Sequence, residues 1–109
     1  GIVPYEESAG AHCAFVAKAV EYVASGLPSV CTPLKSIQRY FQNEPMIRFS
    51  KFEGEDFGRK IVSWLEQSPL DWQIDACKSA ARVKSELDWQ PLCSKAVDFI
   101  EGIHARSAK

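Results

Sequence analysis

Residues 16–34 read VAKAVEYVASGLPSVCTPL, and this stretch decides the fold. Its first half is rich in alanine and predicts a helix, which we expect to run from His12 to Ser25. Gly26 and Pro28 are typical of the end of a helix. The apolar run over 27–32 then predicts a short buried strand. Because the helix is apolar nearly all round, we expect it to be buried on several sides.

Outward from this stretch, strands and helices alternate along the chain. The pattern predicts strands over 1–5, 27–32 and 46–49, and helices over 12–25, 33–41, 56–67, 72–86 and from Asp88 to about Ile103. Such alternation is typical of a parallel sheet covered by helices. The prediction is therefore an α/β fold with a short parallel sheet and a helical C-terminal part, forming one small domain over residues 1–109.

Composition and charge exclude several functional classes. The 109 residues carry 13 Lys and Arg against 14 Asp and Glu, a formal net charge of −1. This balance gives no broad field for binding nucleic acid or a membrane surface. No apolar run approaches the roughly 18 residues that a membrane span needs. The four cysteines show no CxxC spacing, so the sequence predicts no metal site, and we expect reduced, small apolar side chains.

The loop after the first strand is the first candidate site. It reads ESAGAHCA over 7–14 and leads into the predicted helix. Small residues before a helix can offer backbone N–H groups to a phosphate. The candidate phosphate-binding residues in this loop are Ser8, Ala9, Gly10, Ala11 and His12.

Lys18 and Glu21 are the second candidate site, because they share one face of a helix predicted to be mostly buried. Two explanations are open. The two side chains could form a structural ion pair. They could instead face a polar crevice, with Lys18 on a diphosphate and Glu21 accepting hydrogen bonds from the vicinal diol of a ribose.

A longer pattern includes these two residues. A strand ending in Pro4-Tyr5 is followed by Lys18, Glu21, Tyr22, Ala24, Gly26, Pro28, Val30 and Thr32, in the spacing K-x-x-E-Y-x-A-x-G-x-P-x-V-x-T. This arrangement resembles the C-terminal, donor-binding lobe of GT-B fold glycosyltransferases. The motif covers about the first third of the chain, and the order of elements is similar over all of it. Many retaining members carry a second Glu eight residues before the one matched by Glu21, and that position is Cys13 here.

The resemblance implies a partial Rossmann-like lobe that binds a UDP- or GDP-type nucleotide-sugar. Glu21 would bind the ribose hydroxyls, Lys18 the diphosphate, and the loop over 6–14 the phosphates and sugar. The nucleotide-sugar is the substrate, and no separate cofactor or metal is implied. The parent enzyme would be cytoplasmic and could associate with the inner face of a membrane, and its acceptor-binding N-terminal lobe would lie outside this chain. The chain alone should then not catalyse sugar transfer.

Two other interpretations stay open. The chain could be a non-catalytic α/β module that binds a protein partner, with Lys18 and Glu21 as a structural pair. A phosphoacceptor-type doubly wound domain has weaker support, because the second predicted strand ends in Cys31-Thr32 rather than in acidic residues. A short sheet also predicts an exposed edge that could self-associate.

Overall fold

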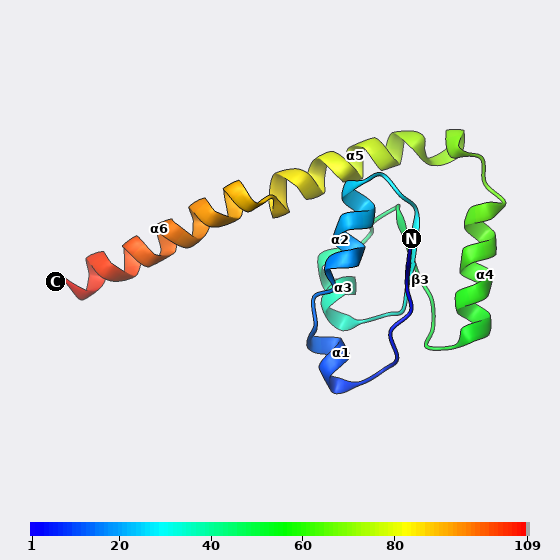
Figure 1. Cartoon of the computed structure of the whole chain (residues 1–109), viewed down its shortest axis with the longest axis horizontal. Coiled ribbons are helices and arrows are strands. Elements are labelled where there is room, and N and C mark those ends of the chain that lie inside the picture. The colour runs from blue at the N-terminus through cyan, green and yellow to red at the C-terminus, as the bar shows by residue number, and fades with distance from the viewer. Residues whose placement is uncertain (109) are drawn as a thin grey trace.

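The computed structural model describes residues 1–108 and shows a mixed α/β fold made mostly of helices (Figure 1). In chain order the elements are β1 (Ile2–Val3), α1 (Ala9–Cys13), α2 (Ala17–Ala24), β2 (Ser29–Cys31), α3 (Lys35–Tyr40), β3 (Ile47–Phe49), α4 (Gly54–Leu65), α5 (Pro69–Leu87) and α6 (Trp89–Ser107). The predicted alternation of short strands and helices is confirmed, and so is the helical C-terminal part.

The three strands form one parallel sheet in the order β1-β2-β3. Ile2 lies opposite Val30, and Val30 lies opposite Arg48. The central strand β2 is buried over its whole length, whereas β1 and β3 are the edges. Edge strands of two and three residues offer few unpaired backbone groups, and self-association along them stays a prediction.

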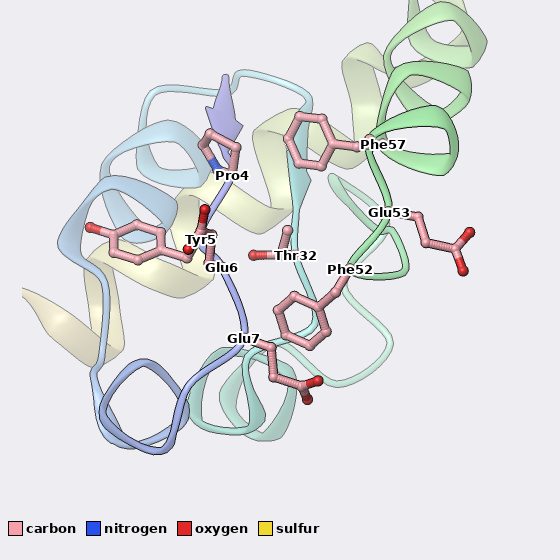
Figure 2. Close-up of a pocket in the computed structure, with 9 residues that line it drawn as sticks. Pro4, Tyr5, Glu6, Glu7, Thr32, Phe52, Glu53 and Phe57 are labelled. Atoms are coloured by element: carbon pink, nitrogen blue, oxygen red, sulfur yellow. The ribbon is translucent and has the colours of Figure 1, made fainter.

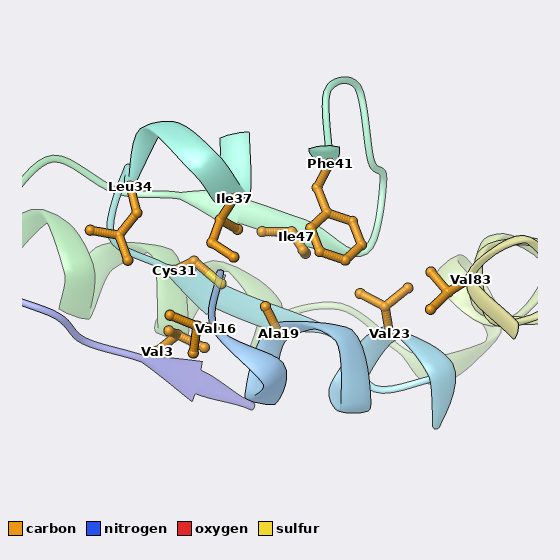
Figure 3. Close-up of a cluster of buried hydrophobic side chains, with 10 residues drawn as sticks. All are labelled: Val3, Val16, Ala19, Val23, Cys31, Leu34, Ile37, Phe41, Ile47 and Val83. Carbon is orange, nitrogen blue, oxygen red and sulfur yellow. The ribbon is translucent and has the colours of Figure 1, made fainter. Parts of the chain in front are cut away.

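The two faces of the sheet are covered by different helices, because side chains alternate along each strand. On one face, Val3, Cys31 and Ile47 join the main apolar core with side chains from α2 and α3, as Figure 3 shows. On the other face, α4 packs against β2 and β3. There the Trp64 indole N–H donates to the Ser29 carbonyl oxygen at 3.0 Å.

The helix predicted over 12–25 is wrong as one element, because the chain leaves the helical conformation at Ala14. Helix α1 begins inside the predicted loop, where the Ser8 side chain caps it by accepting from the Ala11 N–H at 3.0 Å. Ala14 is extended, and its carbonyl oxygen accepts a hydrogen bond from Ser36. The break also places Val16 in the core, 7% exposed. Burial and a tertiary hydrogen bond thus override the helix propensity of this alanine-rich stretch.

A buried carboxylate anchors α5 to the turn before β3. The Glu44 side chain is 2% exposed and accepts from the Arg82 guanidinium at 2.7 Å. It also accepts from the Ser79 hydroxyl and from the Met46 N–H. Val83, also on α5, packs into the main apolar core. Within the described residues, this is the buried ion pair that joins α5 to the sheet layer.

Helix α6 extends away from the rest of the molecule (Figure 1). Asp88 caps it as predicted, accepting from the Trp89 N–H at 2.9 Å. The apolar stripe of α6 is exposed, with Phe99 and Ile100 65% and 63% accessible. No helix within residues 1–108 has the length and apolar character needed to cross a bilayer.

The Glu44 anchor generates a stability prediction. Glu44→Ala should lower the free energy of unfolding by about 3 kcal/mol, because it leaves a partly buried Arg82 and a buried hydroxyl without their shared acceptor. Urea unfolding followed by circular dichroism measures this. Glu101→Ala, at an exposed position of α6, is the control and should change stability by less than about 0.5 kcal/mol. Equal stability of the two variants would contradict the claim that the buried Glu44 carboxylate stabilises the packing of α5.

The cysteines generate a second prediction, because they differ in exposure. All four thiols are free; Cys31 is buried in β2, whereas Cys13, Cys77 and Cys93 are exposed. Burial raises the pKa of Cys31 to about 12, which keeps it a thiol. Iodoacetamide should modify the three exposed thiols of the folded chain and reach Cys31 only in urea, as mass spectrometry would show. Rapid labelling of Cys31 in the folded state would refute this.

Candidate cleft at the carboxyl edge of the sheet

An open cleft lies where the three parallel strands end. The segments that follow β1, β2 and β3 meet there, as the carboxyl ends of parallel strands must. The cleft has a volume of about 450 Å³ and is lined by Pro4, Tyr5, Glu6, Glu7, Thr32, Phe52, Glu53, Gly54 and Phe57 (Figure 2). This is the region in which open α/β sheets bind ligands, so it is the candidate functional site.

The floor of the cleft is formed by Thr32, directly after the central strand. Its side chain lies between the rings of Phe52 and Phe57 in Figure 2. The Thr32 hydroxyl donates to the Val3 carbonyl oxygen at 3.3 Å, which leaves its oxygen lone pairs as acceptors. The backbone N–H of Thr32 donates to the same carbonyl at 3.1 Å, so the residue is held firmly in place.

The lining is acidic and aromatic. Glu6, Glu7 and Glu53 are among the lining residues, which include no lysine or arginine, although the Glu53 carboxylate points away from Thr32 in Figure 2. Carboxylates accept hydrogen bonds from hydroxyl groups, and phenylalanine rings offer flat apolar faces. The same carboxylates repel a phosphate. The cleft therefore suits a hydroxylated, uncharged group such as a sugar or ribose better than it suits a phosphate.

His12 forms part of the wall beside this cleft. Its Nδ1 accepts the backbone N–H of Lys35 at 3.2 Å, and its Nε2 lies 3.1 Å from the Glu7 carboxylate. Since the N–H of Lys35 can only donate, Nδ1 is unprotonated and Nε2 carries the proton that is donated to Glu7. The ring also meets Phe52 edge-on, with centroids 5.7 Å apart. With both nitrogens engaged, His12 positions Glu7 and Phe52 rather than serving as a free base.

The other residues of the predicted phosphate loop are used within α1. Ser8 caps the helix through its side chain, and its carbonyl oxygen accepts the N–H of His12 at 3.0 Å. The N–H groups of Ala11 and His12, which were expected to be available to a phosphate, are therefore engaged. Ala9 and Gly10 form the first turn of α1, and a Cβ added at Gly10 would meet open space.

Lys18 and Glu21 are both exposed on α2 and do not line the cleft. Only Ala19 and Val23 of this helix are buried, so the expectation of burial on several sides is wrong. Within residues 1–108 no ion pair joins Lys18 to Glu21. The structure therefore does not support the explanation that these two residues form a structural ion pair. Because α2 connects two parallel strands, its first turn, with Lys18, lies toward the carboxyl edge of the sheet.

Sequence reasoning missed the aromatic part of the site. Phe52, Glu53 and Phe57 fall in and after a segment that reads only as a polar loop followed by an amphipathic helix. The available signal was their position directly after the third strand of a parallel sheet. Among residues 1–108, no cluster of three or more His, Cys, Asp or Glu side chains is arranged to hold a metal ion.

Comparisons of the chain with protein-family models, with curated proteins and with solved structures find no match. Function is therefore inferred from the residues that line the cleft and from the sequence pattern around Lys18 and Glu21.

The tautomer of His12 is directly testable. At about pH 8, where an ordinary imidazole is neutral, long-range ¹H–¹⁵N NMR should show His12 in the Nε2–H form. His104, exposed on α6, is the internal control and should show an averaged tautomer pattern. An Nδ1–H form of His12 would contradict the hydrogen bond from Lys35.

Proposed function

We propose that this chain is the donor-binding part of a glycosyltransferase, and that a nucleotide-sugar binds at the carboxyl edge of its sheet. The observation that carries the proposal is the combination of carboxylates and aromatic rings in the cleft where three parallel strands end. The reaction would be transfer of a sugar from a nucleoside diphosphate to an acceptor. The acceptor would be held by a part of the enzyme outside this chain.

The chemistry of the cleft supports a sugar or ribose as the bound group. One carboxylate offers two acceptor oxygens, which suits the two donors of a vicinal diol. The rings of Phe52 and Phe57, on either side of Thr32, can pack against the C–H face of a sugar ring or against a nucleobase (Figure 2). The volume of about 450 Å³ falls in the range of ordinary ligand sites.

The topology supports a partial Rossmann-like lobe. The order β-α-β-α-β in a parallel sheet is the repeating unit of such lobes, and it places the cleft at their usual ligand-binding edge. The resemblance to GT-B enzymes implies Lys18 for the diphosphate and Glu21 for the ribose; both lie on α2 outside the cleft lining, so their part in binding is tested separately from the cleft. The exposure of both side chains leaves them accessible to a ligand.

A second candidate function has one observation in its favour. Trp89, Phe99 and Ile100 are exposed on α6, a surface that suits a protein partner. The second candidate function is therefore the non-catalytic protein-binding module that the sequence allowed, although Lys18 and Glu21 do not form the ion pair expected for it.

An NMR titration of the ¹⁵N-labelled chain with UDP, GDP and ADP separates the two functions. The donor-binding proposal expects shifts at residues 4–12, Thr32 and 52–57, with one nucleotide bound more tightly than the others. Unchanged spectra with all three nucleotides at millimolar concentration would count against the proposal and favour the interaction module.

Matched variants then test the residues. Glu6→Gln removes the carboxylate of a residue that lines the cleft, and Glu21→Ala removes the expected ribose ligand; each should weaken nucleotide binding about tenfold, the usual effect of losing a charged hydrogen-bond acceptor. Glu55→Gln, in the first turn of α4 and outside the cleft lining, is the control for Glu6→Gln. Equal nucleotide affinities of Glu6→Gln and Glu55→Gln would contradict the claim that the cleft binds the nucleotide-sugar.

A further inference from the structure

A second hollow lies on the other side of His12. It has a volume of about 600 Å³ and is lined by His12, Phe15, Lys35, Ser36, Arg39 and Tyr40. The α1–α2 connection forms one side of it, and α3 forms the other. We name it the α3 groove. The imidazole of His12 lines the groove while its Nε2 bonds to Glu7 in the cleft, so this side chain stands between the two hollows.

The α3 groove is cationic. Lys35 and Arg39 are four residues apart, share one face of α3, and are both exposed. Among residues 1–108 neither side chain forms an ion pair, and no carboxylate lines the groove. Like charges at this spacing destabilise a helix, so an anion between them would relieve the repulsion.

The neighbouring carboxylates are already engaged. Glu7 is bonded to His12, and Glu86 accepts from the Tyr40 hydroxyl at 2.5 Å and from Arg82 at 3.2 Å. Burial and the contact with Glu86 raise the pKa of Tyr40 to about 12, so its hydroxyl stays neutral beside the groove. Within the part of the chain that the structure describes, the two cations therefore have no anionic partner and remain available to a ligand.

The groove also has an apolar side. Phe15 is 47% exposed, and its ring meets Tyr40 edge-on with centroids 5.5 Å apart. An exposed ring beside two cations suits a ligand that carries both a charged and a flat apolar part.

A second basic hollow, beside α4, differs in this respect. It contains Arg48, Arg59 and Lys60, together with Asp56 and Glu66. Arg48 lies over the Trp64 ring at 3.9 Å, and Arg59 is 3.4 Å from Asp56. Its arginines thus have partners within the protein, which Lys35 and Arg39 lack within residues 1–108.

We infer that the α3 groove is a binding site for a phosphate or diphosphate group borne by a flat organic moiety. Lys35 and Arg39 hold the phosphate oxygens, and the Phe15 ring packs against the organic part. The phosphate could be free or belong to a nucleotide. Assigning it to the donor diphosphate rests on the proposed function; the anion site itself does not.

An NMR titration with three probes tests this inference. Pyrophosphate should shift the amide signals of residues 35–40, UDP should do so at lower concentration, and uridine alone should not. The double variant Lys35→Ala/Arg39→Ala should weaken pyrophosphate binding about tenfold or more, because both charge-assisted contacts are lost. The double variant Lys78→Ala/Lys84→Ala removes the same charge from exposed positions of α5 and should bind as the parent chain does.

The outcomes separate this inference from the proposed function. If pyrophosphate shifts residues 35–40 while no nucleotide affects the cleft, the anion site stands and the proposed function fails. If UDP shifts the cleft but neither UDP nor pyrophosphate shifts residues 35–40, the anion site is overturned. It is also overturned if the Lys35→Ala/Arg39→Ala and Lys78→Ala/Lys84→Ala variants bind pyrophosphate equally.

Discussion

The burial of the central strand β2 on both faces is the constraint on which the rest of the structure depends. Its three residues are all inaccessible, with α2 and α3 packed on one face of the sheet and α4 on the other. A strand buried on both faces is typical of parallel sheets whose strands are connected by helices, because each crossover must return over a sheet face. The parallel pairing in turn brings the ends of all three strands to one edge. The cleft is thus a consequence of how the core is built.

Acidic and basic side chains line two separate hollows on either side of His12. Carboxylates and phenylalanines gather in the cleft, whereas Lys35 and Arg39 lie in the α3 groove. His12 stands between them, held by hydrogen bonds at both ring nitrogens. A hydroxylated ligand group and a phosphate have opposite requirements for charge, so neighbouring acidic and basic hollows suit a ligand that contains both. A nucleotide-sugar is such a ligand.

Much of the fold follows from local sequence signals. The strands, the helical C-terminal part and the Asp88 cap could be predicted because each depends on residues close in the chain. The break at Ala14 could not, because it depends on Ser36, 22 residues away, and on the burial of Val16. The apolar stripe of α6 correctly indicates a helix, but the pattern contains no information on what packs against it. His12 was predicted to help bind a phosphate, but in the structure its backbone N–H is engaged within α1 and both ring nitrogens form hydrogen bonds. Phe52 and Phe57 emerge only when the third strand takes its place in the sheet.

The most direct test of this account is an isotope-filtered NOE experiment on the chain with ¹³C-labelled phenylalanine, in complex with the UDP- or GDP-sugar that it binds best. The account predicts NOEs from ribose or sugar protons to the rings of Phe52 and Phe57. Phe99, exposed on α6, is an internal reference that should show none. NOEs to Phe99 without any to Phe52 or Phe57 would contradict the claim that the carboxyl edge of the sheet is the binding site.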